Sequence, residues 1–510
     1  MLVSEGDECF DEHVSSLQLK RKGVKVVVIG AGIGGLTVAA LLARKGFNVS
    51  VLESQPYPGG CAATFEHNGY RFDAGATVGC GFHKKGPLDL LGEELGISWP
   101  IMSCPAAWDF IHGDRIIHLS HARQEILREF PGSISFWEEQ DRLASLLWSL
   151  AAEALPWPPS GMDELGALFR KTLRKAPVLS PMLPLVNKTA LQWLASYGLD
   201  TDSDFVRFID AQLLISVQTT AQYANAVNAA IALDLPSKGT HRLTGGIGSV
   251  AERLAAAVDD YGGRVMYGAS AQSIQYKGRR VFSVKTSDET CYPADIVVAN
   301  LTPDSLSCLF GENTYPEAGI KKGPVPEWSA FVLYLGIEES AFSERPVSHV
   351  QIVGKSGDLG EGNSLFVSVS PSDDSLRAPE GFRAVTVSTH TRPEPWFEAR
   401  AAGKEMYSKR KESYTTRIMS LLSQHFHGIE QKISTLSAAT PVTWERYTGR
   451  RQGYVGGYPQ KSLFNVRGPG TPFKNLFLTG DSVFPGQSLP GVVTGARRVA
   501  ELVERRFGSL

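Results

Sequence analysis

A glycine-rich segment near the N-terminus has the residue types and spacing that bind a phosphate-containing ligand. The pattern G-x-G-x-x-G is met by the run Gly30-Ala31-Gly32-Ile33-Gly34-Gly35. Glycines at these positions allow a tight turn and let the backbone approach a pyrophosphate closely. Glu53 follows 18 residues after Gly35, where a carboxylate can accept hydrogen bonds from both hydroxyls of a ribose. Because this carboxylate would repel a 2′-phosphate, the pattern predicts a dinucleotide that lacks one.

The elements that must position these residues are predicted on both sides of the glycines. Residues 24–29 are β-branched, as in a buried parallel strand, and residues 36–44 are small and apolar, as in a helix. Residues 48–52 form a second strand that ends at Glu53. The helix start offers free N–H groups and a positive dipole end to phosphates. We therefore predict an α/β fold with a Rossmann-type domain.

Two further segments of small residues extend the predicted site. They are Gly59-Gly60-Cys61-Ala62 and Gly75-Ala76-Thr77. Small side chains there would let a longer ligand cross the sheet with backbone amides facing it, which predicts FAD rather than NAD. Many proteins that bind FAD in this way have an arginine where this chain has Cys61. Cys61 can be interpreted as a covalent flavin attachment point or as a small buried residue, and we expect the second.

A segment near the C-terminus is predicted to meet the same ligand. A short strand runs into Gly480 and Asp481, and a helix of small residues starts at Gly491. We expect Asp481 to bind the ribityl chain or a phosphate-bridging water. The backbone N–H groups of Gly491, Val492 and Val493 are expected to face the flavin ring.

A third piece of the cofactor domain is predicted between the other two. An amphipathic helix at 250–261 precedes a strand in which the backbone of Val265 would face the adenine edge, and 294–300 is a further buried strand. The FAD-binding domain is therefore predicted to be discontinuous, with the pieces 24–105, 240–305 and 440–510.

The remaining ranges, 106–239 and 306–439, are predicted to form an α+β substrate domain, and residues 1–23 a flexible extension. The first range is mostly helical, and the strand at 330–335 is expected to floor a tunnel. Residues 176–186 are apolar, broken by prolines and flanked by basic residues. They suit a segment that dips into a membrane surface, and a core helix pair with solvated lysines is equally consistent with them.

Composition excludes several classes of function. The formal net charge of -2, without a long basic block, argues against nucleic acid as a partner. The cysteines are scattered and give no metal-binding spacing, which argues against a zinc site and fits a reducing compartment. An acidic N-terminal stretch argues against a secretory or transit peptide, and no apolar run reaches about 18 residues. We expect a peripheral protein on the cytoplasmic side of a membrane.

Several short motifs together resemble a known family, the carotenoid desaturases and isomerases of the phytoene-desaturase type. The motifs are Gly59-Gly60-Cys61-Ala62, Phe72-Asp73-Ala74-Gly75-Ala76-Thr77, Phe130-Pro131-Gly132-Ser133, Glu445-Arg446-Tyr447-Thr448, Gly480-Asp481-Ser482 and Phe484-Pro485-Gly486. The chain is most similar to the C-3′,4′ desaturases, although Gln487-Ser488-Leu489-Pro490-Gly491 is nearer to the phytoene desaturases. The resemblance implies an FAD-dependent desaturase of an acyclic carotenoid. A carotenoid cis–trans isomerase and a non-catalytic escort protein of the same fold are the alternatives.

The implied chemistry needs little from side chains. An unactivated allylic C–H is too weak an acid for a side-chain base, so we expect hydride loss to flavin N5, followed by loss of a proton. Quinone or oxygen would reoxidise the flavin. Asp73, Glu445 and Arg446 are the weak candidates for a proton acceptor or cation stabiliser, and each is interpreted more simply as structural. We expect Glu445 and Arg446 to lie in a strand.

Overall fold

A parallel sheet, assembled from distant parts of the chain, carries the glycine-rich segment. The computed structural model describes residues 23–104, 106–120, 122–153, 155–311, 324–343 and 347–508, so the predicted N-terminal extension lies almost wholly outside the described residues. The sheet order is β19-β13-β1-β2-β9, and each pairing is parallel. Its strands are β1 (Lys25–Ile29), β2 (Asn48–Glu53), β9 (Arg264–Tyr267), β13 (Ile296–Ala299) and β19 (Leu476–Leu478). The predicted Rossmann-type fold is confirmed.

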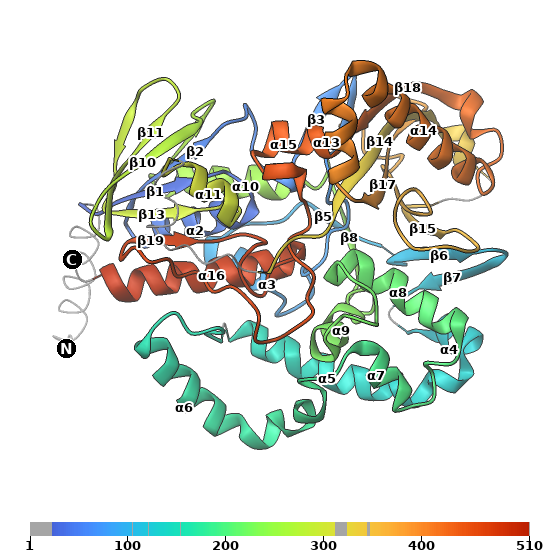
Figure 1. The fold of residues 1–510 in the computed structure, drawn as a ribbon, viewed down its shortest axis with the longest axis horizontal. Coiled ribbons are helices and arrows are strands. Elements are labelled where there is room, and N and C mark those ends of the chain that lie inside the picture. The colour runs from blue at the N-terminus through green and yellow to red at the C-terminus, as the bar shows by residue number, and fades with distance from the viewer. Residues whose placement is uncertain are drawn as a thin grey trace, which may run out of the picture.

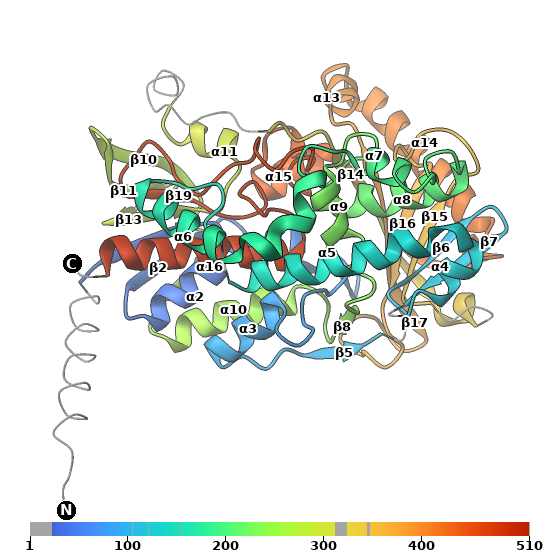
Figure 2. The ribbon, with the colours of Figure 1, turned by 90° about the horizontal axis from the view of Figure 1, so that it is seen from below.

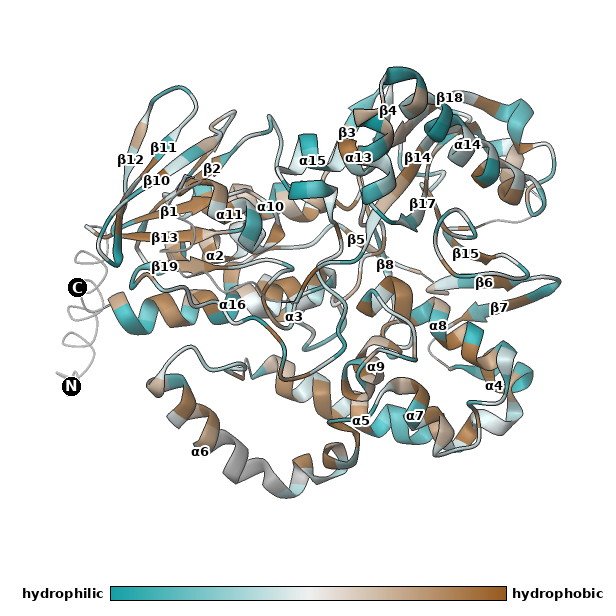
Figure 3. Ribbon diagram, viewed as in Figure 1, coloured by the Kyte–Doolittle hydropathy of each residue, from teal (hydrophilic) through white to brown (hydrophobic). Residues whose placement is uncertain are grey.

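Both faces of this sheet are covered, which explains its apolar strands (Figure 3). Val26 and Val28 of β1 pack into a core shared with helices on one face, whereas Val27 and Ile29 pack against a smaller sheet on the other. The helices of the first face are α2 (Ile33–Arg44), α3 (Pro87–Leu95), α10 (Ser249–Asp260) and α16 (Ser488–Phe507). The second face carries β10 (Ala271–Lys277), β11 (Arg280–Thr286), β12 (Cys291–Pro293) and α11 (Pro303–Cys308).

A second, larger sheet forms the other end of the molecule (Figure 1). Its order is β18-β14-β17-β16-β15-β6-β7, and only the β15–β6 pairing is parallel. The strands are β6 (Trp108–His112), β7 (Arg115–Leu119), β14 (Ser329–Glu338), β15 (His349–Val353), β16 (Ser364–Val369), β17 (Phe382–Thr391) and β18 (Ile433–Ala439). The predicted strand at 330–335 is therefore the centre of β14. Although helices dominate 106–239, β6 and β7 also belong to this sheet.

Helices pack on both sides of the second sheet. Figure 2 shows α5, α8 and α9 as neighbours along this end of the molecule, where they share an aromatic core with Trp108 and Phe110 of β6. On the opposite side Phe331 of β14 stacks on Trp396, with ring centroids 5.3 Å apart. The helices are α4 (Gln124–Glu129), α5 (Ile134–Ala152), α7 (Ala190–Ala195), α8 (Ser203–Val217), α9 (Ala226–Ala232), α13 (Glu394–Ala401), α14 (Lys404–Ser423) and α15 (Pro441–Thr448). Helix α6 (Met162–Leu179) lies apart from this sheet, and its Glu164 pairs with Arg498 of α16.

Two strand pairs and one buried carboxylate join the sheets. The pairs are β3 (Thr64–His67) with β4 (Tyr70–Asp73), and β5 (Ile101–Ser103) with β8 (His241–Leu243). Asp73, at the end of β4, accepts hydrogen bonds from Thr64 Oγ1 at 2.7 Å and from the backbone N of Ile247 at 2.9 Å. Its second oxygen pairs with Arg377 Nη2 at 3.0 Å. Asp73, one of the weak catalytic candidates, therefore has a structural role, because it joins β3, the loop before α10 and Arg377.

No helix within the described ranges is long and apolar enough to span a bilayer.

Candidate functional site

The glycine-rich turn after β1 is packed too tightly for side chains. Gly30 has a φ of +94°, a conformation that favours glycine. A Cβ added to Gly35 would lie 2.2 Å from the Gly30 carbonyl oxygen. A Cβ added to Gly34 would lie 3.0 Å from the Cα of Gly480. The structure therefore brings together the predicted N-terminal and C-terminal segments, and α2 begins at Ile33 with its first amides directed at this turn.

Asn300 organises the glycines and was missed as a site residue from the sequence. It follows β13 directly, and its side chain lies within 4 Å of the Cβ positions of all five glycines of this region. These are Gly30, Gly32, Gly34, Gly35 and Gly480. Its position at the carboxyl end of a strand next to β1 is a signal that could have identified it, because ligands of parallel sheets bind at this edge.

The predicted ribose acid is in place at the end of β2. Glu53 is 7% exposed, and its Oε2 accepts a hydrogen bond of 2.7 Å from the backbone N of Ala31. Its Oε1 accepts one of 2.8 Å from the backbone N of Gln55. Oε1 also accepts from Ser54 Oγ at 3.3 Å, whereas Oε2 keeps a further lone pair for a ribose hydroxyl. Val265 lies on the neighbouring strand β9, whose Tyr267 pairs with Glu53, so the predicted adenine-facing backbone is beside the acid.

The two small-residue segments also meet this turn. The backbone N of Gly59 donates to the Ala31 carbonyl at 2.9 Å, and Gly59 bridges to Gly32. Gly60 and Ala62 follow in a short 3₁₀ turn. The backbone N of Ala76 donates to the Cys61 carbonyl at 3.1 Å, which places Gly75 and Thr77 beside that turn.

An arginine from a distant segment supplies charge next to Cys61. Burial raises the pKa of the Cys61 thiol, and the nearby Arg450 guanidinium acts in the opposite direction. Arg450 also forms a bidentate ion pair with Asp481, with Nη–Oδ distances of 2.8 and 3.0 Å. The guanidinium that many FAD-binding proteins carry at position 61 thus reaches this region from position 450. No pattern around 449–451 predicted it, because the pairing is visible only in three dimensions.

Unsatisfied polar atoms around Gly480 and Asp481 test whether a flavin nucleotide fits here. Thr479 Oγ1, Gln487 Oε1 and the Tyr458 hydroxyl are buried and lack hydrogen-bond partners among the residues that the structure describes. Buried polar atoms of native proteins are nearly always satisfied, so this cluster suits the hydroxyl-rich chain and phosphates of FAD. The glycine cradle and Glu53 suit the same group. The residues present therefore fit FAD.

Helix α16 begins three residues earlier than the sequence suggested. It starts at Ser488 with Gln487 as its N-cap, whereas the prediction started it at Gly491. In a regular helix the amides of Gly491, Val492 and Val493 bond to the preceding turn. The free amides that can meet a ligand are therefore those of the first turn, at Ser488 and Leu489.

The expected strand at Glu445 and Arg446 is wrong. These residues belong to α15, which begins at Pro441 after a Thr440 cap; proline is favoured at the first helical position. Glu445 accepts a hydrogen bond of 2.8 Å from the backbone N of Gln452, and Arg446 is exposed. Neither observation gives Glu445 or Arg446 a role in the reaction.

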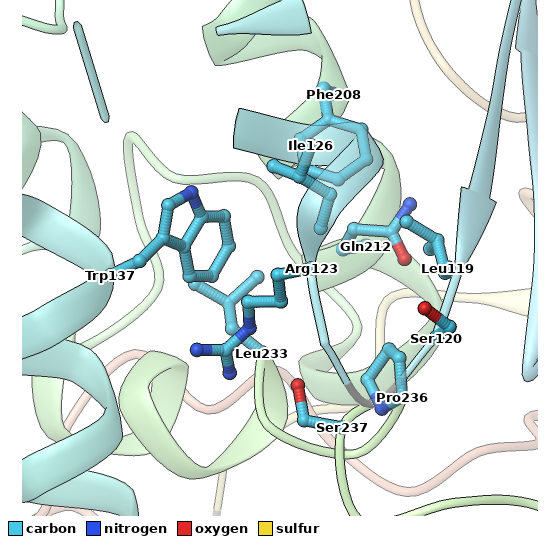
Figure 4. Close-up of a pocket in the computed structure, with 10 residues that line it drawn as sticks. All are labelled: Leu119, Ser120, Arg123, Ile126, Trp137, Phe208, Gln212, Leu233, Pro236 and Ser237. Atoms are coloured by element: carbon cyan, nitrogen blue, oxygen red, sulfur yellow. The ribbon is translucent and has the colours of Figure 1, made fainter. Parts of the chain in front are cut away.

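A separate pocket lies in the helical half of the substrate domain (Figure 4). The ring of Trp137, Ile126 and Phe208 give it apolar walls, and Arg123 and Gln212 add polar groups. The Arg123 guanidinium lies 4.7 Å from the Trp137 ring centroid and pairs with the buried Asp234 at 3.2 Å. Its volume of about 10 Å³ has room for about one water molecule rather than for a long apolar ligand.

The βαβ unit, the buried acid and the tightly packed Gly34–Gly480 contact define a Rossmann-type flavoprotein. The model of the family described as flavin containing amine oxidoreductase matches residues 33–504, and the chain belongs to this family. It is an FAD-dependent oxidoreductase.

Known proteins related to the chain agree with the resemblance seen in its motifs. A chloroplastic prolycopene isomerase of Daucus carota is 28% identical over 93% of this chain and 79% of that protein. A neurosporene-forming phytoene desaturase of Rhodobacter capsulatus is 23% identical over 94% of each. An oxidoreductase of Methanosarcina mazei has a similar fold, with a TM-score of 0.61 at 18% identity over 94% of this chain and all of that one. The predicted membership among the carotenoid desaturases and isomerases is confirmed.

Gly34→Ala should weaken FAD binding, because the added methyl would lie 3.0 Å from both Gly480 and Asn300. We expect at least about a tenfold loss of affinity, a lower limit for displaced backbone contacts. The measurement is the flavin-to-protein absorbance ratio of the purified protein. Gly166→Ala in α6 is the control, since nothing lies within 4 Å of its Cβ position. Wild-type flavin content in Gly34→Ala would contradict the assignment.

Arg450→Met should weaken FAD binding by roughly tenfold, because it leaves the Asp481 carboxylate unpaired beside the cofactor phosphates. Titration of FAD into flavin-free protein, followed by quenching of flavin fluorescence, measures the dissociation constant. The exposed neighbour Arg451 provides the control Arg451→Met, which should match the wild type. An unchanged dissociation constant for Arg450→Met would show that the Arg450 guanidinium does not contribute to FAD binding.

Proposed function

We propose that the protein is an FAD-dependent desaturase of an acyclic carotenoid. The main supporting observation is that the carboxylates around the site already have hydrogen-bond or ion-pair partners within the protein. Glu53 holds backbone amides, Asp73 pairs with Arg377, and Asp481 pairs with Arg450. Such groups are poorly placed to serve as a strong base, which suits a reaction in which hydride leaves first. The names of the phytoene desaturase and prolycopene isomerase relatives support a polyene as substrate.

When bound, FAD supplies the hydride acceptor, and the two electrons then pass to a quinone or to oxygen. The protein's own contribution is to position the polyene and to exclude water. The backbone turn at Gly75, Ala76 and Thr77 is proposed to hold the reacting carbons of the polyene near the ring.

Cis–trans isomerisation of a carotenoid is the second candidate. It is favoured by sequence identity, since the carrot prolycopene isomerase shares 28% of its residues with the chain and the phytoene desaturase 23%. Isomerisation needs no net oxidation of the polyene. The two reactions would use the same binding residues and differ in the mass of the product.

Expression in a host that accumulates acyclic carotenoids, in cis and all-trans forms, separates the two reactions. Desaturation should yield a product two mass units lighter that absorbs at longer wavelength, because conjugation lengthens. Isomerisation should leave the mass unchanged and alter mainly the cis band. Cells that produce the Gly34→Ala variant, with its weakened FAD binding, are the control. If no acyclic carotenoid offered changes in either way, both candidate reactions fail.

We also propose that the protein rests on a membrane surface through α6. Met162, Leu165 and Phe169 form a helical stripe on α6 and are 80%, 46% and 67% exposed. Leu183, in the following 3₁₀ turn, is 69% exposed, whereas Leu185 of the predicted membrane segment is buried. A contiguous exposed apolar stripe is typical of contact with a partner or with lipid, and a polyene substrate is dissolved in lipid.

Flotation with vesicles of phosphatidylcholine and phosphatidylglycerol tests this contact. Wild-type protein should float with the vesicles, and the double variant Phe169→Gln, Leu183→Gln should stay largely in the soluble fraction, because it removes two apolar anchors. Phe282→Gln is the matched control, since Phe282 is 51% exposed on β11 of the cofactor domain. Equal behaviour of the double variant and the wild type would contradict the proposal.

A further inference from the structure

A small polar pocket lies between the segment after β4 and the large sheet. Its volume of about 30 Å³ has room for roughly two water molecules and not for part of a polyene. It is lined by Thr77, by Arg242 of β8 and by His349 of β15. The backbone N of His241 donates to the Gly79 carbonyl at 2.7 Å, which ties β8 to the chain that follows Thr77. The pocket is therefore next to the segment predicted to hold the flavin, and it can act on that segment through the charge of its walls.

Arg242 brings a positive charge to this pocket without a negative partner. The residue is half-buried, its Nε is buried without a hydrogen-bond partner, and no carboxylate in the described part of the chain pairs with it. The second guanidinium of the pocket, that of Arg377, is held by Asp73 at 3.0 Å, so these two charges balance each other. A half-buried cation is costly to keep away from water unless a nearby group compensates for it. The walls of the pocket thus carry one uncompensated positive charge.

His349 does not change this balance of charge. Burial, followed by the charges of Arg242 and Arg377, lowers the pKa of His349 to about 4, so the ring is neutral at physiological pH. Its Nδ1 lies 2.9 Å from Ser368 Oγ, and Ser368 donates to Thr77 Oγ1 at 2.7 Å. The same guanidinium charges that disfavour a cation at His349 favour an anion at the neighbouring flavin segment.

We propose that Arg242 stabilises the negative charge that the flavin ring takes up on reduction, and so raises the reduction potential of the bound cofactor. In the proposed reaction a C–H bond of the polyene breaks, and its hydrogen leaves with both electrons for the ring. The ring then carries one negative charge, and the polyene cation loses a proton to water. A fixed positive charge beside the ring favours this reduced state. This inference rests on the proposed function and adds a charge-stabilising residue to it.

The reduction potential of the flavin in the FAD-loaded protein, measured without a polyene by equilibration with a redox dye of known potential, tests the inference. Arg242→Met removes the charge and keeps an unbranched side chain. A full charge that acts over about 10 Å at an effective dielectric constant of about 20 shifts such an equilibrium by roughly tenfold. Reduced flavin should therefore be disfavoured roughly tenfold in Arg242→Met, which lowers the two-electron potential by about 30 mV. Arg242→Lys keeps the charge and should retain most of the wild-type potential.

Arg253→Met, at an exposed arginine of α10, is the control and should keep the wild-type potential. Flavin content shows whether each variant is folded, and Arg242→Gln, which is neutral but keeps a hydrogen-bond donor, serves if Arg242→Met does not bind flavin. A wild-type potential in the neutral variant would overturn the inference. A potential of Arg242→Lys as low as that of Arg242→Met would also overturn it, because the role of Arg242 would then be structural. Since no polyene is present, either result is independent of whether a carotenoid is converted in the expression host.

Discussion

The buried carboxylate of Asp73 is the interaction on which the two-domain arrangement depends. A carboxylate can be kept ionised away from water only if donors surround it. Here the donors come from β3, from the loop before α10 and from Arg377 of the substrate domain. One carboxylate therefore joins the paired strand β3 and two distant segments to the end of β4. The hydrogen bonds and ion pair of Asp73 therefore help to hold the second, larger sheet in place relative to the cofactor site.

The cofactor region is built mainly from backbone, and this explains why it tolerates so few side chains. Gly34 and Gly480 approach to the point where a methyl group would not fit, and Asn300 fills the remaining space between the glycines. Side-chain charge is confined to Glu53 at one end and to the Arg450–Asp481 pair at the other. The glycines determine where the ligand can lie, and the charged groups determine which ligand it is.

Features that rest on local pattern could be predicted from the sequence. The β-branched run of β1, the glycine turn and Glu53 lie within one βαβ unit, and the structure has them where the spacing indicates. Features that rest on tertiary partners could not be predicted. Arg450 becomes important only because folding brings it to Asp481 and Cys61. The start of α15 is different: Thr440 and Pro441 are a local helix signal that the prediction of a strand overlooked. Gln487 precedes α16 without a side-chain cap, because its amide donates instead to the Tyr458 carbonyl at 2.6 Å, a contact that only the folded chain provides.

The membrane contact proposed for α6 has a mechanical consequence. Glu164 of α6 and Arg498 of α16 form an ion pair of 2.8 Å with side chains only 1% and 4% exposed, and separating such a pair costs about 3–5 kcal/mol. Helix α16 has 20 residues, about 30 Å at 1.5 Å per residue, and its first turn is at the cofactor. A displacement of α6 would therefore reach the predicted flavin site through a helix rather than through a loop. The proposed contact surface of α6 and the first turn of α16 are joined by this ion pair and this one helix.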